Sequence, residues 1–130
     1  MHKVVFSIVI PTFNRSLNII KIIKKLINSP FKTEIIICDS KSKDQTKEKV
    51  LLLKSIYKHK SIKYIDIKQN NHSKKRNEGI KKAIGKYIIL LDDDGIPEKD
   101  FLKKYKILLD KVKNNRAVIC GSVGYNFNEQ

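Results

Sequence analysis

Four short segments rich in β-branched residues constrain the fold of this 130-residue chain more than any other feature. They span residues 4–10, 34–38, 62–67 and 87–91. Their apolar residues lack helical spacing, and segments of this length are typical of strands. Runs that are apolar almost throughout predict strands buried on both faces, as in parallel sheets covered by helices. The segment 62–67 is less apolar than the others, so we expect it near an edge of the sheet.

Amphipathic segments separate these strands and predict helices. Ser16 is expected to cap a helix over residues 17–27, because apolar residues recur there with the period of a helix. A second helix is predicted over residues 45–57. A third is predicted over residues 74–84, with Gly85 behind it in the left-handed conformation that often ends a helix. Each predicted helix follows one of the first three strands.

The C-terminal part of the chain predicts one further helix and one further strand. Pro97 suits the first turn of a helix, because its ring fixes the backbone angle that a helix needs there. Apolar residues then recur at helical spacing from Phe101 to Val112, and they would form the inner face of this helix. The segment 117–120 predicts the start of a fifth strand.

The alternation of strands and helices predicts the α/β class. We expect a doubly wound, mostly parallel sheet flanked by helices on both faces, since crossovers between parallel strands are right-handed. At this length we expect a single domain spanning residues 1–130. The strand order 3-2-1-4 would place the reversal point of the sheet between the first and fourth strands, which is where such sheets bind ligands.

The charge of the chain suggests a polyanionic partner. Lysine and arginine total 28 against 13 acidic residues, a formal net charge of +15. Only three of the basic residues are arginines, whereas proteins that read nucleic acids favour arginine for paired contacts to bases and phosphates. We therefore expect no nucleic acid partner, and keep a basic module for RNA or an anionic membrane as the alternative function.

Cysteine usage and hydropathy predict a cytoplasmic location for the chain. The two cysteines, Cys38 and Cys120, form no disulfide framework and no zinc-binding spacing. Residues 1–10 are followed by Pro11 and polar residues instead of a small-residue cleavage site, so a secretory signal is not predicted. No apolar stretch approaches the ~18 residues that a membrane span requires.

Polar residues follow three of the predicted strands. Residues 11–15 follow the first strand, Asp39 ends the second, and Asp92, Asp93 and Asp94 follow the fourth. Three adjacent carboxylates repel one another, so a cation is expected to compensate them. Carboxylate oxygens with open positions suit Mg²⁺ or Mn²⁺ bound together with substrate phosphates. The alternative without a ligand is a solvated acidic turn that caps the helix predicted after Pro97.

Other residues near these strand ends have two interpretations each. Phe13 could stack on a base or pack as a small apolar contact. Asp39 could accept hydrogen bonds from a base or cap the next turn. Arg76 lies early in the third predicted helix, where it and the helix N-terminus could face a phosphate, or it could be a surface residue. His72 could serve as a base or simply be exposed.

Four sequence blocks carry a resemblance to a known family. The blocks are Ser7–Arg15, Ile35–Thr46, Arg76–Gly79 continuing through Ala83, Gly85, Lys86 and Tyr87, and Leu91–Asp94. They follow one another in the order and spacing of family 2 glycosyltransferases with the GT-A fold, which the chain resembles from residue 4 to about residue 123. Each block is modest alone, and together they are specific.

The resemblance implies a nucleotide-sugar site with a defined base pocket. Pro11, Phe13 and Asn14 would line this pocket, with Phe13 in place of the commoner tyrosine, and Thr12 belongs to the same binding segment. Asp39 would form a hydrogen bond with the base, often uracil. The donor that this favours is a UDP-sugar.

The resemblance also implies how the rest of the donor is held. Arg76 would lie near the nucleotide phosphates. The acidic run matches the DxD motif of the family, so Asp93 would contact the ribose, and Asp94 with Asp92 would bind Mg²⁺ or Mn²⁺ at the diphosphate. An acceptor hydroxyl would then attack the anomeric carbon of the sugar with inversion.

The same resemblance indicates what we expect this sequence to lack. In the family the catalytic base and most acceptor contacts follow the fifth strand, so no residue here is assigned as the base, and the chain is expected to supply the donor-binding half. The loop 70–73 also lacks the glycine often found there. The sugar and the acceptor, whether glycan, lipid-linked or protein, stay open. A peripheral contact with an anionic membrane on the cytoplasmic side would suit the excess of lysine.

Other nucleotide or phosphate enzymes fit the motifs less well. The acidic run followed by Gly95 mimics the nucleophile motif of haloacid dehalogenase-like phosphatases, but that motif normally opens the fold and here leaves too few residues behind it. A dinucleotide-binding domain would need a glycine-rich turn after the first strand, and residues 11–14 contain no glycine. A P-loop is equally absent.

Overall fold

The computed structural model describes residues 3–113 and 116–121. By its internal contacts the chain divides into two compact units, which meet between Glu98 and Lys99. Among the described residues, the first unit contains the sheet and three helices, and the second contains one helix.

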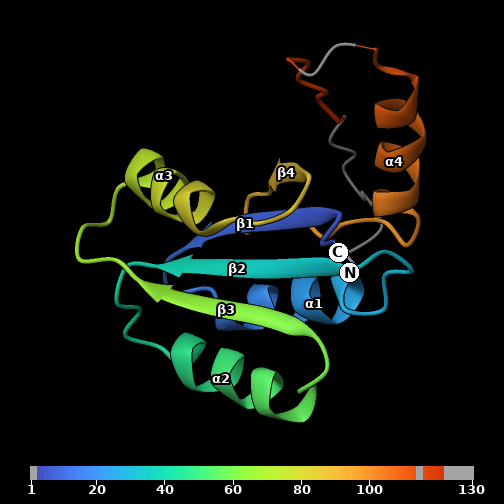
Figure 1. Cartoon of the computed structure of the whole chain (residues 1–130). Helices are drawn as coiled ribbons and strands as arrows, with labels where there is room; N and C mark the ends of the chain where they lie inside the picture. Colours follow the sequence, from blue (N-terminus) through green and yellow to red (C-terminus); the bar gives the residue numbers. More distant parts are fainter. Residues whose placement is uncertain (1–2, 114–115, 122–130) are drawn as a thin grey trace, which may run out of the picture. The chain divides into compact units, whose positions relative to one another are not determined.

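The first unit is built on a four-stranded, fully parallel sheet in the order β3-β2-β1-β4 (Figure 1). The strands are β1 (Phe6–Thr12), β2 (Thr33–Asp39), β3 (Ser61–Asp66) and β4 (Tyr87–Leu90). The predicted class, strand order and edge position of the third strand are therefore confirmed. The central strand β1 is buried along its whole length, because it is paired on both sides and covered on both faces.

Helices cover both faces of this sheet. In Figure 1, α1 (Ser16–Leu26) and α2 (Thr46–Ile56) lie on one face and α3 (His72–Lys82) lies on the other. The apolar spacing of α1 explains its packing, since the residues at its inner face are fully or almost fully buried: Ile19, Ile22, Ile23 and Leu26. Gly79 allows α3 to approach the sheet closely, because a Cβ there would lie 2.8 Å from the sulfur of Cys38 and would overlap Val9.

The start of α1 corrects one prediction. Ser16 does not cap the helix: it is the first helical residue, and the preceding Arg15 provides no side-chain cap. The backbone N–H of Ser16 instead donates to Asp44 Oδ2 at 3.0 Å. The other oxygen of Asp44 accepts from the backbone N–H of Thr46 at 3.0 Å, at the start of α2. One carboxylate thus caps two helices. Burial alone would raise the pKa of Asp44, but the hydrogen bonds that its carboxylate accepts outweigh burial and hold the pKa below its usual value.

A second correction concerns Gly85. The helix α3 ends at Lys82, and no glycine among the described residues has a positive φ. A glycine is needed at this position for space instead. A Cβ on Gly85 would lie 2.6 Å from the backbone nitrogen of Ser7 and 2.8 Å from the carbonyl carbon of Phe6. The loop before β4 therefore packs directly on the backbone of β1.

This close approach makes a testable prediction. We expect Gly85→Ala to lower the free energy of unfolding by about 2 kcal/mol, because backbone atoms cannot move aside as a side chain can. The matched control is Gly95→Ala, since a Cβ on Gly95 would have no atom within 4 Å. Urea denaturation measures both variants. Equal stability of the two would show that the loop before β4 does not pack as described.

The second unit contains α4 (Phe101–Lys111) and differs from the sequence prediction at both ends. The helix begins at Phe101, with Asp100 before it, so Pro97 lies outside its first turn. Residues 117–120 are described and do not form the predicted fifth strand. Val118 is 89% exposed, and a β-branched segment becomes a strand only when another strand pairs with it. No such pairing involves these residues within the part of the chain that the structure describes.

Candidate functional site

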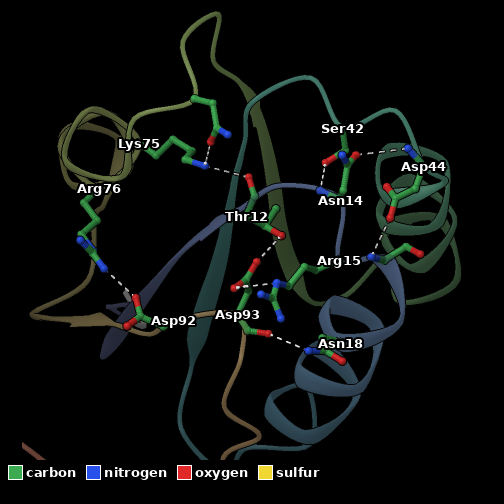
Figure 2. A network of polar contacts seen from close by, with 12 residues as sticks. Thr12, Asn14, Arg15, Asn18, Ser42, Asp44, Lys75, Arg76, Asp92 and Asp93 are labelled. Atoms are coloured by element: carbon green, nitrogen blue, oxygen red, sulfur yellow. Dashed lines mark hydrogen bonds and ion pairs between the residues drawn. The ribbon is translucent and has the colours of Figure 1, made fainter.

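The carboxyl edge of the sheet brings together residues that are far apart in the sequence. Thr12, the last residue of β1, pairs with Asp39, the last residue of β2. The acidic run follows β4, the neighbour of β1 on its other side. Figure 2 shows the side chains of Thr12 and Asp93 facing each other, with the Thr12 hydroxyl donating to Asp93 Oδ2 at 2.9 Å. The polar clusters at the ends of the first and fourth strands therefore meet, as predicted.

Asp93 is held from three directions. Besides accepting from Thr12, its side chain lies 3.7 Å from Arg15 Nε, measured from Oδ1. Its backbone carbonyl accepts from Asn18 Nδ2 at 3.2 Å. The Asp93 side chain is only 13% exposed. These contacts fix the turn that follows β4, so the carboxylates on either side of Asp93 project from a defined position.

Asp92 and Asp94 are the exposed members of the run. Asp92 forms an ion pair with Arg76 of α3, and Arg76 Nη2 lies 2.6 Å from Asp92 Oδ1 (Figure 2). Asp94 is exposed, and it makes no hydrogen bond or ion pair with any other residue that the structure describes. The predicted phosphate contact Arg76 thus lies beside the predicted metal ligand Asp92.

The chemistry of this donor set fits a divalent cation that is shared with a ligand. Within residues 3–113 and 116–121 no group of three or more histidine, cysteine or acidic side chains could enclose a metal ion. Two carboxylates, Asp92 and Asp94, offer oxygen atoms and leave the remaining positions open. Mg²⁺ is commonly held by one or two carboxylates together with substrate phosphates and waters. The residues present therefore suit a cation that arrives with a phosphate ligand.

Asp39 is completely buried, and its oxygens already have partners. Oδ2 accepts from the Tyr64 hydroxyl at 2.6 Å, and Oδ1 accepts from the Ser42 hydroxyl at 2.5 Å. Burial, together with this hydrogen bond to a carboxylate, raises the pKa of Tyr64 far above its usual value, so Tyr64 stays a donor. A base that donates to Asp39 would share or replace the Ser42 hydroxyl.

The loop after β1 is locked to the loop after β2. Asn14 has a positive φ of 52°. Its backbone N–H donates to Ser42 Oγ at 2.8 Å, and its side-chain oxygen accepts from the backbone N–H of Lys43 at 2.7 Å (Figure 2). Asparagine tolerates this conformation better than most residues. Asn14 therefore serves here to join the two loops.

Phe13 faces solvent at the rim of an open groove. The ring is partly exposed, whereas its neighbours Pro11 and Thr12 are buried. The groove has a volume of about 570 Å³ and is lined by Phe13, Asn14, Arg15, Ser16, Leu17, Asn18 and Asp44. An exposed aromatic face beside an open groove can stack on a flat ligand. His72, in contrast, is simply an exposed residue at the start of α3.

Lys75 is the site residue that sequence reasoning missed. It lies in α3 and is fully buried, a placement that lysine almost never adopts without partners. Its ammonium donates to the Thr12 carbonyl at 3.0 Å and to Asn70 Oδ1 at 2.8 Å. Burial lowers the pKa of Lys75, and the carboxylates of Asp39 and Asp93 oppose that fall. The only sequence signal was its position next to Arg76.

The fold and this edge define a class of protein: a Rossmann-like α/β domain with an acidic, phosphate-compatible site at the switch point between β1 and β4. Comparison with known proteins identifies the family. The model of glycosyl transferase family 2 matches residues 7–130. The chain therefore belongs to glycosyl transferase family 2.

Relatives and solved structures agree with this assignment. An uncharacterised glycosyltransferase of Rickettsia conorii is 36% identical over 125 residues, which are 95% of this chain and 20% of that protein. The crystal structure of TarS from Staphylococcus aureus in complex with UDP-GlcNAc superposes with a TM-score of 0.70 at 25% identity, covering 82% of this chain and 31% of that one. A mannosyltransferase from Pyrobaculum calidifontis with GDP-Man and Mn²⁺ shares the fold, with a TM-score of 0.69 at 20% identity, covering 78% and 31%. The chain spans only a fifth to two-fifths of the first curated relatives that it matches.

Proposed function

We propose that this chain is the donor-binding part of a glycosyltransferase that moves a sugar from a nucleotide-diphosphate sugar, favouring UDP, to an acceptor hydroxyl. The observation that carries the proposal is the acidic turn behind β4, which Asp93 anchors to Thr12 while Asp94 is left exposed. Family membership and the UDP-GlcNAc bound to TarS support the same assignment. The activity and substrates of the whole protein are proposed here, because the chain spans only part of the length of its relatives.

Different residues at the carboxyl edge contact different parts of the nucleotide-sugar donor. Phe13 offers its ring to the base, and Asp39 accepts a hydrogen bond from the base. Asp93 faces the ribose. These assignments place the nucleoside over the ends of β1 and β2, where the loops are locked together and Thr12 is fixed. A prearranged pocket of this kind reduces the ordering cost of binding.

The diphosphate is bound on the β4 side. Asp94 and Asp92 would hold Mg²⁺ or Mn²⁺, and Arg76, which pairs with Asp92 in this structure, would lie near the phosphates. Such an ion would supply charge stabilisation for the departing nucleoside diphosphate. The acceptor hydroxyl attacks the anomeric carbon on the face opposite the diphosphate. The bond from that carbon to the diphosphate oxygen breaks as the new bond forms, so the configuration of the carbon is inverted. The proton acceptor for that hydroxyl is not assigned to any residue of this chain.

A cytoplasmic location with peripheral contact at an anionic membrane belongs to the same proposal. It rests on the net charge of +15, since lysine-rich surfaces are attracted to anionic lipid. No helix among the described residues is long and apolar enough to span a bilayer. Flotation with liposomes tests the contact. If the protein floats with liposomes only when they contain acidic lipid, the contact is supported; if flotation is the same with neutral and acidic liposomes, the contact is contradicted.

Calorimetric titration tests the donor site itself. The chain is titrated with UDP, GDP and heparin, each with Mn²⁺ and again with EDTA. The proposal expects saturable binding of one nucleoside diphosphate that EDTA abolishes. The alternative, a basic module for polyanions, expects heparin binding that is indifferent to metal and falls steeply with salt. Binding of heparin alone would overturn the proposal.

A further inference from the structure

Lys75 holds several segments of the carboxyl edge together. Its ammonium contacts the carbonyl of Thr12 at the end of β1 and the side chain of Asn70 in the loop before α3 (Figure 2). The same Thr12 carbonyl accepts from the backbone N–H of Ser40 at 3.4 Å, and the Ser40 hydroxyl donates to the Gln69 carbonyl at 3.0 Å. One buried cation therefore lies where the ends of β1 and β2 meet the β3–α3 loop.

Burying this cation is costly unless opposite charges and acceptors compensate it. Lys75 has both kinds of compensation, because Asp39 and Asp93 act on it electrostatically and two oxygens accept its protons. The neighbouring Arg76 opposes it with a like charge. An apolar side chain would fill the same volume without this cost, so the arrangement calls for a role other than filling the core.

The contacts of Thr12 indicate what that role is. The Thr12 carbonyl accepts a hydrogen bond from the Lys75 ammonium, and the Thr12 hydroxyl donates one to Asp93. Phe13 follows Thr12 directly in the chain. A shift of the Thr12 backbone would therefore move the stacking ring and the acidic turn together. These are the two parts of the edge that the proposed function assigns to the base and to the ribose and diphosphate.

We propose that Lys75 is a positioning residue of the donor site, whose buried ammonium fixes Thr12 and the β3–α3 loop so that Phe13 and Asp93 face the same nucleotide. This inference rests on the proposed function. Lys75 acts through Thr12 and Asn70, and touches no ligand itself. Losing its ammonium leaves the Thr12 carbonyl with a weaker set of donors and leaves Asn70 without its partner.

The test compares two adjacent lysines. Lys75→Met removes the ammonium and keeps most of the side-chain volume. Lys74→Met is the matched control, because Lys74 is exposed and its ammonium donates to Gln69 Oε1, at 3.0 Å. Calorimetry with UDP and Mn²⁺ is carried out well below the melting temperature of each variant. We expect affinity at least about tenfold weaker for Lys75→Met and within about twofold of wild type for Lys74→Met.

Amide NMR shifts separate positioning from a purely structural role. In the ligand-free Lys75→Met variant, we expect the amides of Phe13 and Asp93 to move while those in the middle of β1 stay in place. A folded variant that binds UDP as tightly as wild type would overturn the inference. If wild type itself fails to bind UDP, the proposed function fails instead, so the two failures are distinct.

A second variant keeps the inference testable if Lys75→Met does not fold. Asn70→Ala changes an exposed loop residue and removes one of the two acceptors of Lys75. We expect it to fold and to weaken UDP binding by about threefold to tenfold. Wild-type affinity in this variant would contradict a role for the Lys75 contacts in positioning the donor site.

Discussion

Asp94→Ala is expected to abolish the metal dependence of UDP binding and to weaken affinity in the presence of Mn²⁺ by at least about 100-fold. Asp94 is exposed and has no polar partner among the described residues, so its removal should cost the fold almost nothing. Asp92 alone would then face the cation, and Arg76 already competes for its carboxylate at 2.6 Å. Calorimetry with and without EDTA measures the effect.

The control for this prediction is another exposed aspartate. Asp110→Asn makes the same change in net charge as Asp94→Ala, and Asp110 lies in α4, where it pairs with Lys106. The account expects the control to bind UDP and Mn²⁺ like wild type, with both variants melting within a few degrees of it. Metal-dependent binding that survives in Asp94→Ala would mean that the acidic run does not hold the cation.

Glu34→Ala is expected to lower the free energy of unfolding by about 3 kcal/mol or more. Glu34 is fully buried at the amino-terminal part of β2 and pairs with Lys63 of β3 at 2.6 Å. It also accepts from the Ser7 hydroxyl in β1 and from the backbone N–H of Ile84 at 2.7 Å. Its loss would leave the buried Ser7 hydroxyl and the backbone N–H of Ile84 without this acceptor, and Lys63 without its carboxylate partner. Urea denaturation at pH 7 measures the cost.

A partly exposed glutamate provides the comparison. Glu78→Ala removes a carboxylate whose partner is the exposed Lys81, a pair of the kind that contributes little to stability. We expect this variant to stay within about 0.5 kcal/mol of wild type. If Glu34→Ala were equally mild, the buried network would not join β1, β2 and the loop before β4 as described.

The same network makes stability depend on pH. Burial alone would raise the pKa of Glu34, but the contacts from Lys63, Ser7 and Ile84 outweigh it and leave the pKa below its usual value of 4.5. A carboxyl with a lowered pKa in the folded state stabilises the protein above the unfolded pKa and loses that contribution as the pH falls through the folded one. Wild type should therefore lose stability below pH 4.5 more steeply than Glu34→Gln. Parallel pH profiles would contradict this.

The parallel sheet could be predicted because it depends on patterns that the sequence displays directly. The meeting of the polar clusters was predicted on the assumption of the strand order 3-2-1-4, which the structure confirms. Nearly continuous apolar runs favour a parallel sheet. In a parallel sheet the carboxyl ends of neighbouring strands lie at one edge, so Thr12, Asp39 and the acidic run meet there. The lower apolar content of residues 62–67 likewise predicted their place at an edge of the sheet. The sheet type and this edge position need only the composition and spacing of the strand segments.

Contacts between distant side chains could not be predicted in this way. The helix cap supplied by Asp44 comes from a loop almost thirty residues away from Ser16, and local cap rules examine neighbours only. Gly85 was assigned to a helix end because glycine often ends helices, whereas its actual requirement is space against β1. The burial of Lys75 depends on acceptors that only the folded chain brings together.

Amide NMR shifts on titration with UDP and Mg²⁺ test most directly whether the carboxyl edge is the donor site. The account predicts saturable shifts concentrated in residues 12–16, 39–44, 70–76 and 92–95, with little change at the amino-terminal ends of the strands. Shifts confined to the lysine-rich outer faces of α1 and α2, or no shifts at all, would contradict it.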